Sequence, residues 1–168
     1  CYHGHVHGQE DFYSAFAHSC NCAFADMGLN LGAGSLRSTA EDLLFNKALP
    51  LNSYKTSRFT LEKNSANALV MQTSIGQGNT LVSPMHMALI TSAIANDGAY
   101  RKFRFYDKVV DRDGNVLLNT ELEPKTVIRK ENAKLLTLAM EDVIKSGTGK
   151  KAAFDGMSLA GKSGTTTD

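Results

Sequence analysis

Apolar residues recur every three or four positions in three stretches of the chain, and this period predicts helices with one buried face. The stretches cover residues 10–24, 84–95 and 130–145. The second has the clearest boundary, because Ser83 provides a hydroxyl N-cap and Pro84 is the residue preferred at the first helical position. We expect these helices to place their apolar faces against the core.

Other segments carry a weaker pattern. Residues 38–41 have the spacing of a capping box and predict a short helix that ends before Pro50. Residues 65–77 are interpreted as a loop, because their apolar residues are mixed with polar ones and glycines close the run. Two apolar runs around residues 111–115 predict a β-hairpin with Gly114 available at the turn. Together these elements predict a mixed α/β, helix-rich fold.

The first predicted helix contains a polar break. Ser19 and Asn21 interrupt the apolar pattern of residues 10–24. Gly28 and Gly32 are then expected to end the turn that follows, because glycine commonly terminates helices. We therefore expect Ser19 and Asn21 to lie together at a helix boundary.

Length and composition limit the possible functions. At 168 residues with 42% hydrophobic residues, the chain can bury one ordinary core, which predicts a single domain. A formal net charge of +1, spread along the chain, argues against a nucleic-acid-binding surface. Polar residues break the longest apolar stretches, so we predict no transmembrane segment and no signal peptide. The abrupt first and last residues lead us to expect an excised part of a larger protein.

At the N-terminus, residues that could bind zinc alternate with residues that could not. The possible ligands are Cys1, His3, His5 and His7. In an extended strand such residues would share one face. Glycines interrupt that strand, however, so we predict neither a bound metal nor any other cofactor.

The cysteines are too few for a disulfide framework, and whether they form a single bridge stays open. Cys20 is expected to have a packing role. The other two cysteines are Cys1 and Cys22.

The stretch Leu159–Thr165 combines a cation, hydroxyls and glycines in one strand-like run. Ser163 and Thr165 would alternate onto one side of an extended backbone, and Lys162 would supply positive charge there. Gly164 would let a ligand approach the main chain closely. Such a run is suited to binding a carboxylate.

Residues 156–163 also match the G-x-x-x-x-G-K-[ST] pattern of a phosphate-binding loop. That loop needs a buried strand before its first glycine and a helix after its lysine. Here the preceding residues are largely polar, and Gly164 and three threonines follow. A P-loop nucleotide hydrolase is therefore a remote alternative.

Several motifs occur in an order and spacing that identify a family resemblance. They are, in order, Ser19-x-Asn21, Ile75–Gly78, Ser83–Gly98, Gly147–Gly149 and Ala160–Thr165. Together they resemble the transpeptidase domain of penicillin-binding proteins, most closely the high-molecular-weight type. The resemblance implies that residues 1–168 are the middle portion of a serine transpeptidase/β-lactamase-like fold, with a helical lobe, a hairpin and the K-[ST]-G strand.

The resemblance also implies roles for the motif residues. Ser19 matches the serine that relays a proton to the leaving amine, and Asn21 matches the amide that binds the substrate backbone. The backbone N–H of Thr165 matches one half of the oxyanion hole. Substrate binding is implied for Lys162, Ser163, Gly164 and Thr165.

The family's nucleophile is the serine of an S-x-x-K motif, and no serine of this sequence has lysine three positions later. For the parent protein the resemblance implies a peptidoglycan D,D-transpeptidase that binds D-alanyl-D-alanine stem peptides and β-lactams through an acyl-serine. It also implies a membrane-anchored parent on the extracytoplasmic face of a bacterial membrane, in a cell-wall synthesis complex. The chain alone is expected to be inactive and to self-associate. The alternative is a catalytically silent β-lactam-sensing or structural cell-wall protein.

Overall fold

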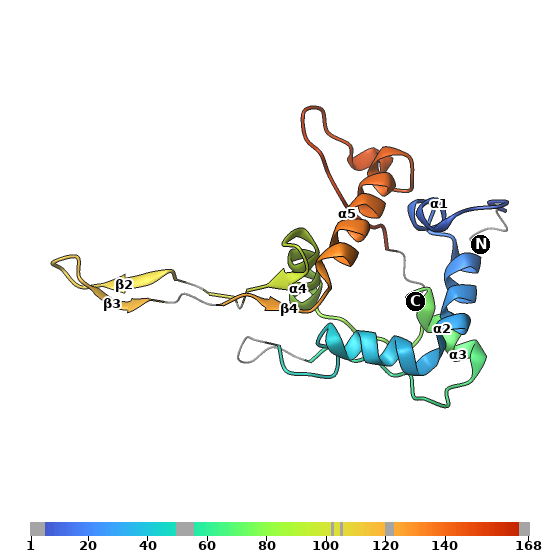
Figure 1. The fold of residues 1–168 in the computed structure, drawn as a ribbon, viewed down its shortest axis with the longest axis horizontal. Coiled ribbons are helices and arrows are strands. Elements are labelled where there is room, and N and C mark those ends of the chain that lie inside the picture. Colours follow the sequence, from blue (N-terminus) through green and yellow to red (C-terminus); the bar gives the residue numbers. More distant parts are fainter. Residues whose placement is uncertain (1–5, 50–55, 102, 105, 120–122, 165–168) are drawn as a thin grey trace.

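The computed structural model describes residues 6–49, 56–101, 103–104, 106–119 and 123–164 and is dominated by helices (Figure 1). The helices are α1 (Phe12–Ala17), α2 (Asn21–Asp42), α3 (Asn67–Ser74), α4 (Pro84–Ala95) and α5 (Lys130–Lys145), with a 3₁₀ turn at Lys150–Ala152. The strands are β1 (Ala99–Tyr100), β2 (Lys108–Val110), β3 (Val116–Asn119) and β4 (Lys125–Thr126). The predicted mixed, helix-rich fold class is confirmed.

Two of the predicted helices have the expected ends. Helix α4 begins at Pro84, and the Ser83 hydroxyl accepts a hydrogen bond from the His86 backbone N–H at 3.2 Å, as expected for an N-cap. Helix α5 spans Lys130–Lys145. In the described part of the chain, no helix has both the length and the apolar run needed to cross a membrane.

The strands form two small antiparallel sheets. Strand β1 pairs with β4 beside α4, whereas β2 and β3 form the predicted hairpin. Its turn is closed by the Asp111 carboxylate, which accepts the backbone N–H groups of Asp113 and Asn115 at 2.9 and 2.8 Å. Figure 1 shows this hairpin extending away from the helices. Its apolar side chains are therefore exposed, among them Val109, Val116 and Leu117.

The stretch expected to be the K-[ST]-G strand forms no strand within the described residues up to Gly164. It passes instead beside α5, where the backbone N–H of Gly161 donates to the Met140 carbonyl at 3.0 Å. A strand requires a ladder of hydrogen bonds to a neighbouring strand, and no described segment provides one here.

The helix break predicted at Ser19 is present. Ser19 has a positive φ of 54°, and the backbone N–H of Cys20 donates to the Ala15 carbonyl at 2.9 Å, which closes α1 before α2 begins. The expectation that Gly28 ends the next turn is wrong, because Gly28 lies inside α2. The break expected at Gly32 is present: its backbone is non-helical, with a φ of 77° that glycine tolerates, so α2 consists of two helical segments that meet at a kink there.

Two further local predictions are wrong for the same physical reason. Residues 38–41 are the last turns of α2 and do not begin a new helix, and residues 67–74 form α3 where a loop was expected. The helices that contain these segments pack against each other, since Ala33 of α2 and Val70 of α3 share a buried cluster with Leu61. Tertiary packing therefore outweighed the local capping and glycine signals.

A second cluster of buried side chains lies around α4. It contains Leu89 and Ala93 of α4 together with Tyr100 of β1, and Leu44 and Leu49 complete it. The core is therefore divided between the α2–α3 pair and the α4–β1 region.

The α2–α3 packing requires glycine at position 28. A Cβ atom there would lie 2.5 Å from Ser74 Cβ and 1.8 Å from Ser74 Oγ. We predict that Gly28→Ala lowers the free energy of unfolding by about 1–3 kcal/mol, the usual cost of overpacking. Thermal unfolding of the full-length protein measures it.

Gly34→Ala is the matched control, since a Cβ atom there meets no heavy atom within 4 Å. It should leave stability unchanged or raise it by up to about 1 kcal/mol, because alanine favours helix over glycine. Adding Ser74→Gly should restore much of the stability that Gly28→Ala removes. Equal effects of the two alanine variants would contradict the packing argument.

Candidate active-site cleft

An open cleft of about 980 Å³ lies between the α1–α2 break, the end of α3 and the last described residues of the chain. It contains each predicted site residue that the structure describes. These are Ser19, Asn21, Lys162, Ser163 and Gly164. Thr165 lies outside the described residues. Residues far apart in sequence therefore meet at one site.

Lys162 connects the two ends of the chain across this cleft. Its Nζ donates hydrogen bonds to Ser19 Oγ at 2.9 Å and to its neighbour's carbonyl, Ser163 O, at 3.1 Å. It also lies 5.7 Å from the centre of the Phe16 ring, within the range of a cation–π contact. The S-x-N and K-[ST]-G motifs are thus directly hydrogen-bonded to each other.

The Lys162 ammonium has only neutral partners among the described residues, where it forms no ion pair. Burial lowers its pKa below the 10.5 of an ordinary lysine, because partial loss of water disfavours the charged form. A carboxylate bound in the cleft would supply the missing counter-charge. The site is therefore suited to an anionic ligand.

Ser19 and Asn21 flank the first turn of α2. Asn21 is the first residue of the helix and Cys20 is its N-cap, so the positive φ of Ser19 turns the chain between the two helices. Ser19 and Asn21 are partly buried, whereas Cys20 between them is fully buried. This geometry presents both polar side chains to the cleft and buries Cys20 between them.

Thr148 is a cleft residue to which the sequence alone assigned no role. Its Oγ1 lies 2.6 Å from Ser163 Oγ, within hydrogen-bonding distance, so the two hydroxyls lie side by side near Lys162. The backbone N–H of Thr148 donates to the Ala17 carbonyl at 3.1 Å. The signal in the sequence was the Gly147-Thr148-Gly149 triplet, whose glycines suggest close backbone packing rather than a site.

The end of α3 forms the remaining wall of the cleft. The Ile75–Gly78 motif contributes Gly76 and Gln77 to this wall, together with Gln72 and Ser74 of α3. Gly76 and Gly78 both have positive φ, which forms the tight turn after α3. Because residues 67–74 form α3, the polar residues at the C-terminal end of this helix lie at the cleft.

The phosphate-loop alternative does not fit the structure. Residues 150–152 form a 3₁₀ turn, and Phe154 and Met157 pair around a tight turn at Gly156, so no buried strand leads into the would-be loop. No helix begins after Lys162 within the residues described up to Gly164. The site therefore lacks the helix N-terminus that a phosphate-binding loop requires.

Comparison with known families identifies the domain. Residues 2–168 match the model described as the penicillin-binding protein transpeptidase domain. The chain belongs to this family. Among curated proteins it is 28% identical to the peptidoglycan D,D-transpeptidase PbpA of Mycolicibacterium smegmatis over 90% of this chain, and 28% identical to stage V sporulation protein D of Bacillus subtilis over 98%.

Solved structures agree with this assignment. The D,D-transpeptidase domain of a peptidoglycan glycosyltransferase from Eggerthella lenta matches 98% of the chain with a TM-score of 0.87 at 24% identity. An imipenem acyl-enzyme complex of penicillin-binding protein A from M. tuberculosis matches 95% of it with a TM-score of 0.81 at 26% identity. The fold is therefore that of part of a transpeptidase domain.

The chain spans only part of each relative. It covers 31% of the M. smegmatis protein, 26% of the B. subtilis protein, and 43% and 37% of the two solved chains. Since no serine of this sequence belongs to an S-x-x-K motif, the residues present here constitute the S-x-N and K-[ST]-G sides of a cleft.

The geometry of the cleft depends on glycine at position 147. A Cβ atom there would lie 2.2 Å from the Ala17 carbonyl oxygen. We predict that Gly147→Ala separates α1 from α5, displaces Thr148 and Ser19, and lowers the free energy of unfolding by about 1–3 kcal/mol. Thermal unfolding of the full-length protein checks the stability change.

Gly161→Ala serves as the control, because its Cβ would make only an ordinary contact of 3.5 Å with Ile144 Cδ1. It should change stability by less than about 1 kcal/mol. A Gly147→Ala protein as stable as the control would show that the α1–α5 contact is looser than described.

Proposed function

We propose that the full-length protein containing this chain is a peptidoglycan D,D-transpeptidase that works through an acyl-serine. The observation that carries the proposal is the Lys162–Ser19 hydrogen bond, which unites two motifs of the transpeptidase family within one cleft. The relative named peptidoglycan D,D-transpeptidase PbpA and the acyl-enzyme structure of penicillin-binding protein A support the reaction class.

In this proposal Ser19 and Asn21 act at the leaving-group side of the substrate. Ser19 Oγ accepts the hydrogen bond of Lys162 Nζ, so its own hydroxyl hydrogen is free to donate toward the leaving amine. Asn21, at the first turn of α2, offers an amide that can both donate to and accept from a peptide backbone.

Lys162 binds the carboxylate of the terminal D-alanine, or that of a β-lactam. Its ammonium lacks an anionic partner among the described residues, and the hydroxyls of Ser163 and Thr148 lie beside it as further donors. Gly164 leaves open space, since a Cβ atom there would meet nothing within 4 Å. The backbone N–H of Thr165 is proposed as one oxyanion donor.

The nucleophile is proposed to lie on an S-x-x-K motif outside residues 1–168, which form the middle portion of the domain. The chain alone therefore does not acylate. The exposed apolar side chains of the β2–β3 hairpin support the proposal that it self-associates in isolation. The parent is proposed to be membrane-anchored, to act on the extracytoplasmic side of a bacterial membrane and to work within a cell-wall synthesis complex.

Covalent labelling tests the reaction class. The full-length protein is incubated with a penicillin, and intact mass followed by peptide mapping locates any adduct. We expect one adduct, on a serine outside this sequence, because acyl transfer requires an activated hydroxyl beside a base. Residues 1–168 alone are the control and should stay unmodified. A folded full-length protein without an adduct would support a silent β-lactam-sensing or structural role instead.

The carboxylate-binding role of Lys162 has a separate test. Loss of a hydrogen bond to a charged group costs about 1.5–3 kcal/mol, so Lys162→Ala should slow acylation of the full-length protein by about 10- to 100-fold. Lys151→Ala is the matched control, since Lys151 is exposed on the 3₁₀ turn outside the cleft, and should leave the rate unchanged.

The pH dependence of the same reaction adds a second readout. Burial lowers the pKa of Lys162 below 10.5, so its positive charge is lost as pH rises through that lowered pKa. The acylation rate should therefore fall in that alkaline range. In Lys162→Arg the fall should move to higher pH, since arginine stays charged. Identical alkaline profiles for both proteins would remove Lys162 from carboxylate binding.

A further inference from the structure

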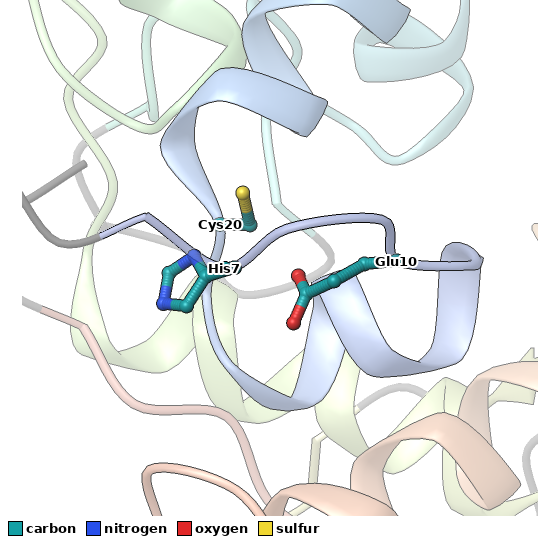
Figure 2. Close-up of side chains that lie close together, drawn as sticks. All are labelled: His7, Glu10 and Cys20. Atoms are coloured by element: carbon teal, nitrogen blue, oxygen red, sulfur yellow. The ribbon is translucent and has the colours of Figure 1, made fainter.

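A cluster of possible metal ligands includes Cys20, the middle residue of the S-x-N motif. His7 and Glu10 come from the segment before α1, and Cys20 is the N-cap of α2. Their ligand atoms all lie within 4.8 Å of one another. Figure 2 shows the Glu10 carboxylate extending toward His7, with Cys20 at the start of the next helix.

Glu10 provides independent evidence for a bound cation. Its side chain is only 9% exposed, and its Oε2 is buried with no hydrogen-bond partner among the described residues. A buried carboxylate oxygen without a partner is costly, because it has lost its water and gained nothing in exchange. Its other oxygen, Oε1, lies 2.5 Å from His18 Nδ1. One oxygen of Glu10 is thus held in place while the other is available for a ligand.

The donor types indicate which cation fits. A thiolate, an imidazole and a carboxylate together suit zinc, whereas calcium and magnesium prefer sites made entirely of oxygen. We propose that His7, Glu10 and Cys20 bind one Zn²⁺ ion. The inference goes beyond the proposed transpeptidase activity and does not depend on it.

The geometry requires only a small contraction. With zinc bonds of about 2.0–2.3 Å in a tetrahedral arrangement, ligand atoms are separated by about 3.3–3.8 Å, compared with the 4.8 Å limit within which they lie here. Three protein ligands leave a fourth position for water or another donor. His18 holds the Glu10 carboxylate and stacks on the His7 ring, with centroids 5.7 Å apart, as an outer-shell partner would.

The ion would stabilise the turn that carries the S-x-N motif. Cys20 lies between Ser19 and Asn21, and Ser19 has a positive φ of 54° that is unfavourable for a residue with a Cβ atom. A bond from Cys20 to zinc would tie this turn to the segment holding His7 and Glu10. This positioning role of the metal, unlike the binding itself, rests on the proposed function.

Metal content of the full-length protein tests the binding. The protein is equilibrated with Zn²⁺, loosely held metal is removed, and bound zinc is measured by mass spectrometry. We expect about one Zn²⁺ per chain. His7→Ala and Cys20→Ser should weaken zinc affinity by more than the about 10- to 100-fold that loss of an outer-shell partner costs. Cys22→Ser, at an exposed neighbouring cysteine, is the control and should bind as the wild type does.

Two features keep the test decisive. His7 is exposed, so His7→Ala removes a ligand without opening the core, whereas Cys20 is buried. Substitution of the wild-type protein with Co²⁺ adds a spectroscopic readout, because a thiolate ligand produces an intense near-ultraviolet absorption. Wild-type protein that retains no zinc, or equal zinc in His7→Ala and wild type, would overturn the proposal, as would cobalt protein without the thiolate band.

The rate of acylation by penicillin tests the positioning role of zinc separately from zinc binding itself. If zinc orders the S-x-N turn, its removal by a chelator should slow acylation of the wild type and of Cys22→Ser, and added zinc should restore the rate. His7→Ala should be slow with or without zinc. An unchanged rate in a protein shown to have lost its zinc would overturn the positioning role, and absence of any acylation would count against the proposed function rather than the metal site.

Discussion

The close contact between Ala17 and Gly147 is the constraint on which the site depends. The Thr148 backbone N–H donates to the Ala17 carbonyl, and no side chain larger than hydrogen fits at position 147. This contact joins the end of α1 to the end of α5, although the two helices are separated by most of the sequence (Figure 1). Ser19 is two residues after Ala17, and the chain after Gly147 returns along α5, where the Gly161 N–H donates to the Met140 carbonyl. These backbone contacts bring Ser19 and Lys162 within hydrogen-bonding distance.

The electrostatics of the cleft follow from what surrounds Lys162. A partly buried ammonium that faces hydroxyls, a carbonyl and an aromatic ring is satisfied in hydrogen bonding but not in charge. Burial that lowers its pKa also strengthens its attraction for an anion, because less water screens the charge. One environment therefore accounts both for the titration of Lys162 and for its suitability as a carboxylate-binding group.

The S-x-N turn has two sets of contacts. Ser19 accepts a hydrogen bond from Lys162. Cys20 is buried next to His7 and Glu10, and the buried Glu10 Oε2, which has no hydrogen-bond partner among the described residues, marks the place of the proposed ion. A residue with positive φ needs such support from its surroundings, because the backbone conformation itself is unfavourable. The Lys162 hydrogen bond and the proposed ion together would keep Ser19 and Asn21 oriented while a substrate enters and leaves.

The sequence by itself determined the features that depend on neighbouring residues. The Ser83 cap and Pro84 specified the start of α4, the apolar stripe specified α5, and the hairpin turn at Gly114 was correct. The ordered motifs also identified the family and most of the cleft residues. Only the tertiary structure decided that residues 38–41 continue α2, that residues 67–74 are helical, and that Thr148 meets Ser163. These features arise from contacts between distant segments. A local sequence pattern does not specify which distant segment will pack against it.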